Sequence, residues 1–233
     1  SSVDGRTRRL ELALDCPVPG DAARLRGRVT LEGVARRSDP SAPLTLDDHD
    51  WSPLTGPARV KADLAVGHRD VLDFAGRGYH DRNGSRRPLD RLGIGWWIWG
   101  RVPLEDRELV YYLCWPTDDE DAEASGAAPE VVALEIDRDG VTHAVPASVR
   151  LHGPRRARWG MRYYERVELW RGDALWLDIR HQTLLDDGPF YLRFATAARR
   201  PGVGIRTGSG ELVHPHRVDL PHWRPLVRMR VHH

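Results

Sequence analysis

Short runs of alternating or wholly apolar residues, separated by turn signals, recur along most of this chain. Helix-period stretches with capping residues are scarce. Because successive side chains of a strand point to opposite faces, such runs indicate strands rather than helices. Many short strands predict an all-β protein built as a sandwich or barrel. The runs predicted as strands are 8–14, 23–31, 58–64, 71–74, 109–115, 131–136, 141–145, 162–170, 174–179, 190–195 and 227–231.

Two polar stretches separate groups of these runs. Residues 36–45 are rich in Ser, Asp and Pro, and residues 117–129 are acidic with several Ala and Gly residues. Both compositions are typical of loops. The second loop is a candidate domain boundary.

Charge and cysteine content exclude several classes of protein. The 35 Lys+Arg residues nearly balance the 34 Asp+Glu residues, which argues against an electrostatic nucleic-acid binder. Cys16 and Cys114 lie far apart and lack zinc-site spacing, so we expect neither a disulfide scaffold nor a structural metal. The most apolar run, residues 92–100, is far shorter than the roughly 20 residues of a membrane-spanning helix. We therefore expect a cytoplasmic protein without a spanning segment.

Histidines near the C-terminus are the remaining candidates for metal ligands. They lie in His214-Pro215-His216 and in His232-His233. No carboxylate or cysteine joins them at ligand spacing, so we expect exposed loop and tail positions rather than a metal site.

Chemistry-bearing residues concentrate in the segments 49–51, 76–84 and 96–101. If the last segment is a strand, Trp97, Trp99 and Arg101 share one face. Tyr79 and Asp81 likewise share a face if their segment is extended, which places a phenol beside a carboxyl group.

These segments resemble a known family. The strings that carry the resemblance are G-x-G-Y-H-D-x-N at 76–83, P-L at 88–89 and W-x-W-G-R at 97–101, with H-x-W at 49–51 upstream. They resemble the hallmark of the carotenoid 1,2-hydratases (hydroxyneurosporene synthases), a family of the broader lipocalin-like superfamily. Residues 25–29, 189–193 and 224–230 are similar to further strands of that family, so the resemblance runs from about residue 25 to the C-terminus.

Two departures from the family pattern change the expected structure. Many relatives continue the motif as N-W-G, whereas this chain has Asn83-Gly84-Ser85. One aromatic wall of the pocket is therefore expected to be either missing or replaced by Trp96. Full-length relatives also carry β structure before the matched region, which makes the chain either a natural short form or a fragment. The resemblance thus implies two lipocalin-like β-barrel or sandwich domains. These are an incomplete first domain, 1–104, with the active-site motifs, and a second domain, 105–233.

The resemblance also implies a reaction and its residues. A carotenoid hydratase is a hydro-lyase that adds water to the terminal C1=C2 bond of an acyclic carotene without a redox cofactor. Asp81 would protonate C2 if burial among aromatic side chains keeps its carboxyl group neutral, and Tyr79 would position or share that proton. Trp51, together with Trp97 or Trp99, would shelter the cation at C1 through its π face. His49 would hold and deprotonate the attacking water. Expected substrate-binding residues are Asn83, Trp96, Trp97, Trp99 and Arg101.

Other interpretations remain open at this point. Asp81 could cap a turn, His49 could be a solvated loop residue, and the tryptophans could be core residues. Within the superfamily, a pericyclase of the Diels–Alderase type would act on a polyene without a proton donor. A non-catalytic carrier of hydrophobic metabolites is the third class. For a carotenoid substrate we expect peripheral membrane contact in a bacterial cell.

Overall fold

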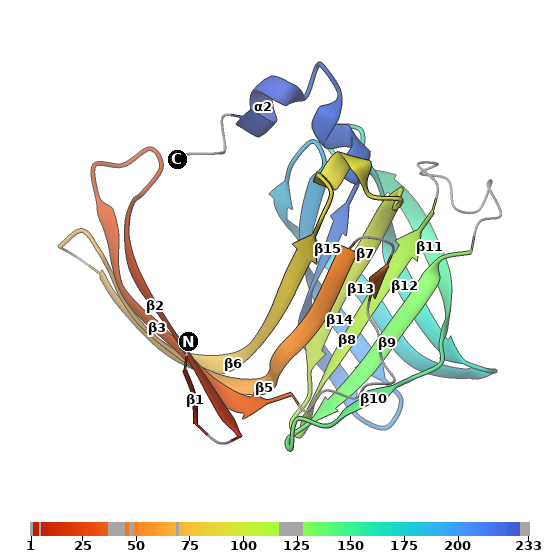
Figure 1. Cartoon of the computed structure of the whole chain (residues 1–233), viewed down its shortest axis with the longest axis horizontal. Coiled ribbons are helices and arrows are strands. Elements are labelled where there is room, and N and C mark those ends of the chain that lie inside the picture. The colour runs from red at the N-terminus through yellow and green to blue at the C-terminus, as the bar shows by residue number, and fades with distance from the viewer. Residues whose placement is uncertain are drawn as a thin grey trace.

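The structure is a computed structural model that describes residues 2–4, 6–36, 45–46, 49–68, 70–116 and 128–228. Strands dominate this part of the chain, so the predicted all-β class is confirmed (Figure 1). None of its helices has the length and apolarity that crossing a membrane requires. The strands are β1 (Ser2–Asp4), β2 (Thr7–Pro17), β3 (Arg24–Ala35), β4 (Thr45–Leu46), β5 (His49–Val66), β6 (Asp70–Ser85), β7 (Trp96–Pro103), β8 (Arg107–Trp115), β9 (Glu130–Asp137), β10 (Thr142–Ala144), β11 (Ser148–Arg156), β12 (Arg162–Arg171), β13 (Ala174–Asp187), β14 (Tyr191–Arg200) and β15 (Gly204–Val213). Short helical segments are η1 (Leu89–Arg91), η2 (Pro215–Asp219) and α2 (Arg224–Arg228).

The first sheet, sheet A, contains β1 to β6 and is strongly curved (Figure 1). It is antiparallel, with the order β1-β2-β3-β5-β4 and with β6 on the other side of β5. Its register aligns Leu12, Val29, Ala62 and Phe74 in one row across four strands. Directly opposed residues lie on the same face of a sheet, so sheet A has one apolar face and one charged face.

The second sheet, sheet B, runs in the order β10-β9-β8-β7-β15-β14-β13-β12-β11 and curls into a barrel-like wall (Figure 1). Its interior holds a packed hydrophobic core. Trp96 and Trp115 stack there with ring centroids 3.8 Å apart, and Tyr111, Tyr164 and Phe194 are fully buried around them.

A second hydrophobic cluster joins the outer face of β7, β8 and β9 to one end of sheet A. Strands β7 and β8 are therefore covered on both faces. A strand that is buried on both sides has no polar face, which explains why residues 109–115 read as an uninterrupted apolar run. Opposite Tyr111 stands Gly100, where any Cβ would collide with the tyrosine ring.

Three expectations of the sequence analysis are corrected by the structure. The strand predicted at 227–231 is wrong for residues 227–228, because these lie in helix α2. Pro225 occupies the first turn of this helix, where the fixed φ of proline is favourable. Strand β15 was not predicted, since three glycines weaken its strand signal. His214 is not exposed but buried at 1 % exposure, where it stacks on Trp96.

Both predicted loops lie largely outside the described residues, at 37–44 and 117–127. The chain passes from sheet A to sheet B between Ser85 and Trp96. Strand β7, which precedes the expected domain boundary at residue 104, thus pairs within sheet B. The division into two domains stays a prediction.

Candidate active site between the two sheets

A cavity of about 290 Å³ lies where the end of sheet A meets the outer face of sheet B. Strands β5 and β6 form one wall, and β7, β8 and β15 form the other. Antiparallel pairing sets Trp51 opposite Asn83, while the two-residue period of β7 points Trp97 and Trp99 toward sheet A. The lining residues are His49, Trp51, Asp81, Asn83, Leu89, Trp97, Trp99, Tyr112 and Glu211.

The Asp81 carboxyl group is tied directly to Trp51. The Trp51 indole Nε1–H donates a hydrogen bond of 2.7 Å to Asp81 Oδ2. Trp51 is only 2 % exposed, and its ring packs edge-on against Tyr112 with centroids 5.3 Å apart. The hydrogen bond fixes the carboxyl group at the cavity wall.

Tyr79 lies beside Asp81 and is supported by a buried ion pair. Its ring packs on Trp99 with centroids 5.8 Å apart, and the Arg101 guanidinium lies 5.6 Å from the ring centroid. Arg101 Nε donates to Glu108 Oε1 at 2.7 Å. Burial, and then the negative charges of Asp81 and Glu108, raise the pKa of Tyr79 well above its ordinary value. The phenol is therefore neutral near pH 7 and retains a proton to donate.

Glu108 is completely buried behind Tyr79. Burial raises its pKa to about 7, against the opposing effect of the Arg101 charge. The Arg101 predicted to bind substrate thus lies on the expected face of β7, but its guanidinium is engaged by Glu108 and by the Tyr79 ring.

His49 begins β5 and is buried, in contrast to a solvated loop residue. Its ring stacks on Trp97 with centroids 5.6 Å apart and meets Tyr112 edge-on. Burial lowers the pKa of His49, although Asp50 opposes the shift. A neutral imidazole at the cavity wall can accept a proton from water.

The sequence-predicted residues separate into three groups. Asp81, His49, Trp51, Asn83, Trp97 and Trp99 line one cavity, and Tyr79 and Arg101 lie directly behind it. Trp96 does not line the cavity. As the neighbour of Trp97 in a strand it must face the other way, into the core of sheet B, so its expected role as a substitute pocket wall is corrected.

Sequence reasoning missed Glu211, Tyr112 and Leu89, which also line the cavity. The sequence did contain a signal for Glu211. In a strand, Glu211 lies on the same face as the apolar Val213, and the intervening Leu212 is apolar as well. An acid at an apolar position of a strand suggests a buried and functional carboxyl group. Because β15 itself was not recognised, that signal was not available.

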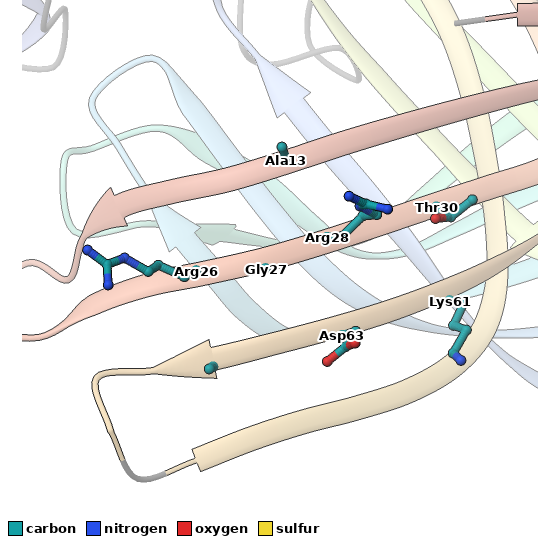
Figure 2. Close-up of a pocket in the computed structure, with 8 residues that line it drawn as sticks. Ala13, Arg26, Gly27, Arg28, Thr30, Lys61 and Asp63 are labelled. Atoms are coloured by element: carbon teal, nitrogen blue, oxygen red, sulfur yellow. The ribbon is translucent and has the colours of Figure 1, made fainter.

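A larger hollow of about 580 Å³ lies on the charged face of sheet A. Figure 2 shows Arg26, Arg28, Lys61 and Asp63 on its strands. Its arginines are exposed and paired with neighbouring acids; Arg28, for example, lies 3.0 Å from Glu11. Such exposed pairs are screened by solvent, so this hollow lacks the buried acid, phenol and indole groups that the smaller cavity brings together.

The smaller cavity can support acid–base chemistry on an apolar substrate. It combines a carboxyl group, a neutral imidazole and several aromatic faces, and indole faces stabilise cations by ~2 kcal/mol or more when desolvated. Because Asp81 and His49 line the same small cavity, both groups face one bound ligand, as acid–base catalysis requires.

Comparison with known proteins identifies the family of this chain. The family model for Carotenoid hydratase CrtC matches residues 1–233. The Acyclic carotenoid 1,2-hydratase of Rhodobacter capsulatus is 29% identical over 213 residues, which cover 89% of this chain and 67% of that protein. The Hydroxyneurosporene dehydrogenase of Chlorobaculum tepidum is 30% identical over 135 residues, covering 57% of this chain and 33% of that protein.

Among solved structures, an AttH-like protein from Nitrosomonas europaea has a TM-score of 0.55 and 16% identity. The match covers 84% of this chain and 66% of that chain. This likeness shows the fold alone. The chain spans about two thirds of the Rhodobacter relative and a third of the Chlorobaculum relative. Since the family model spans the whole chain, the protein belongs to the carotenoid hydratase family.

Proposed function

We propose that the cavity between the two sheets adds water to the terminal C1=C2 bond of an acyclic carotene by acid catalysis, without a cofactor. The observation that carries the proposal is the Asp81 carboxyl group, held 2.7 Å from the Trp51 indole in a cavity lined by aromatic side chains. A cavity of about 290 Å³ has room for roughly ten water volumes. It therefore suits the terminal group of a polyene, whose remaining length would lie outside.

Each step of the reaction has a candidate group. Asp81 donates a proton to C2, and Tyr79 positions or shares that proton. Trp51 and Trp97 stabilise the tertiary cation at C1 through their π faces. His49 holds the water that attacks C1 and removes its proton.

The first prediction tests this chemistry. Turnover in D₂O should place one deuterium at C2 of the product, and oxygen from water should appear at C1. Asp81→Asn, which keeps the size but loses the acid, should lower kcat by roughly 10²-fold or more. Asp73→Asn is the matched control, because Asp73 is an exposed residue of the same strand.

The alternatives predict different products. A pericyclase would yield a product without solvent deuterium and would keep its activity in Asp81→Asn. A carrier would bind the polyene at equilibrium and form no product. Full hydratase activity in Asp81→Asn would refute the assignment of the acid.

The second prediction concerns access to the substrate. Acyclic carotenes partition into lipid, so we infer that the protein meets membranes peripherally, by way of apolar surface near the cavity. Flotation with carotene-free and carotene-loaded liposomes should carry part of the protein upward. Failure to associate with either liposome would contradict a substrate drawn from the membrane.

A further inference from the structure

We propose that Glu211 is a second proton-transfer residue of this cavity: it receives the proton that His49 removes from the attacking water and returns it to Asp81. The inference rests on the proposed hydratase function and deepens it. Two carboxyl groups occupy opposite walls, with Asp81 on β6 of sheet A and Glu211 on β15 of sheet B, and both line the same cavity.

The Glu211 side chain is held in place by its neighbours in sheet B. The Tyr191 hydroxyl group donates to Glu211 Oε2 at 2.8 Å, and Arg193 Nε donates to the Tyr191 oxygen at 3.0 Å. The Trp97 indole lies near this carboxyl group and lowers its pKa. Because Trp97 stacks on His49, one indole contacts both ends of the proposed transfer.

Charges around Glu211 favour proton uptake. Burial raises its pKa, the Tyr191 hydrogen bond opposes that shift, and the negative charge of Asp81 adds to it. Burial and the neighbouring Asp81 carboxyl group therefore both favour a proton on Glu211. The titratable and charged groups around Glu211 are Asp81 on β6, His49 on β5, Tyr112 on β8, and Tyr191 and Arg193 on β14.

A second carboxyl group also meets a need of the site. Burial lowers the pKa of His49, so an imidazolium ion is a poor final position for the proton. A buried carboxylate accepts that proton without leaving a net charge on the ring.

The proton balance of the cycle closes. The Asp81 O–H bond breaks, and the π electrons of C1=C2 form the new C2–H bond, which leaves the cation at C1. The water oxygen bonds to C1, its proton passes through His49 to the Glu211 carboxylate, and Glu211 returns a proton to Asp81 through cavity water. The net change is the addition of one water molecule.

The first test needs no substrate. In protein labelled with ¹³C at its Asp and Glu carboxyl groups, the resonances of Glu108 and Glu211 should both titrate above the ordinary glutamate range. Only the Glu211 resonance should be missing in Glu211→Gln. Asp81→Asn should lower its midpoint, because a negative neighbour is removed. Tyr191→Phe should raise it, because a donor to the charged form is lost. An absent resonance, or a midpoint that Asp81→Asn leaves unchanged, would overturn the coupling of the two groups.

The second test uses the reaction. Glu211 must be ionised to accept a proton, so Glu211→Gln should lower kcat at least 10-fold with little change in KM, and should remove the acidic limb of the kcat–pH profile. Tyr191→Phe keeps the carboxyl group and should move that limb to higher pH. Glu165→Gln, at an exposed position of β12, is the control.

The outcomes separate the two proposals. Wild-type kcat and an unchanged profile in a folded Glu211→Gln protein would overturn the role of Glu211 and leave the hydratase intact. A wild-type protein that forms no hydrated product would refute the hydratase and, with it, this relay. The labelled-carboxyl titration would then still decide whether Asp81 and Glu211 are coupled.

Discussion

Trp51 combines two contacts in one side chain. Its indole N–H donates to Asp81, and its ring packs against Tyr112. The hydrogen bond orients the proposed acid, whereas the ring supplies a π face for a cation. At the scale of the residue, these two contributions can be separated by a substitution that removes one and keeps the other.

We expect Trp51→Phe to lower kcat by roughly 10-fold, less than Asp81→Asn does. The phenyl ring keeps an aromatic face, but the indole hydrogen bond to the Asp81 carboxyl group, typically worth ~0.5–1.5 kcal/mol, is lost. Steady-state kinetics with the same carotene measures the effect. Trp170→Phe removes an indole donor to Glu168 outside the cavity and should leave kcat unchanged. An unaltered kcat in Trp51→Phe would mean that this indole neither orients the acid nor shelters the cation.

At the scale of the element, the strands β7 and β8 separate the core of sheet B from the cavity and contribute side chains to both. One face of the pair packs into the core of sheet B, and the other carries the cavity residues. The Arg101–Glu108 ion pair lies across these two strands, directly behind the Tyr79 ring. Burial of such a pair costs desolvation energy, so its ionisation state should affect the stability of the fold.

Stability should depend on pH through Glu108. Its folded-state pKa is about 7, above the ordinary value of about 4.3. A raised acid pKa contributes stability that is fully present below the unfolded value and is lost as pH rises through about 7. Between pH 4 and 8 the free energy of unfolding of the wild type should therefore fall relative to Glu108→Gln, by ~3 kcal/mol.

Urea unfolding at several pH values measures this difference. Glu165→Gln changes an exposed glutamate that pairs with Arg155 at the surface, and should show the same pH dependence as the wild type because solvent screens that pair. Parallel curves for the wild type and Glu108→Gln would contradict the assigned effect of burial.

At the scale of the whole molecule, the two sheets differ in how they cover their apolar surface. Sheet B curls around its own core, whereas sheet A extends away from it (Figure 1). On the apolar face of sheet A, Leu12, Leu72 and Phe74 are 48 %, 50 % and 51 % exposed. Apolar patches of this kind favour association between molecules.

We expect the chain to self-associate through this face. The double variant Leu72→Thr/Phe74→Thr keeps strand propensity but removes apolar area, and should lower the weight-average sedimentation coefficient at micromolar concentration. Leu185→Thr/Ile205→Thr changes two residues of sheet B that are even more exposed, at 59 % and 68 %, and should have no such effect. A wild type that stays monomeric at all concentrations, or a control variant that acts equally, would refute this role of sheet A.

The sequence by itself determined the all-β class, most strand positions and the central motif residues. Period-two alternation is local, so it could be read wherever one face of a strand meets solvent. The same rule correctly put Tyr79 with Asp81, and Trp97 with Trp99, on shared faces. It failed at β15, where glycines weaken the pattern, and at α2, where a short apolar and basic run suits a strand and a helix equally.

Only the tertiary structure decided which faces meet. The packing of sheet A on the outer face of β7 and β8 joins His49 and Asp81 to Glu211, a residue 130 positions farther along the chain than Asp81. It also sends Trp96 into the core and places Glu108 behind Tyr79. These choices depend on contacts between strands that are distant in sequence, and no local pattern records them. The motifs therefore predicted residues of both walls, whereas the fold added Tyr112 and Glu211 to the wall formed by sheet B.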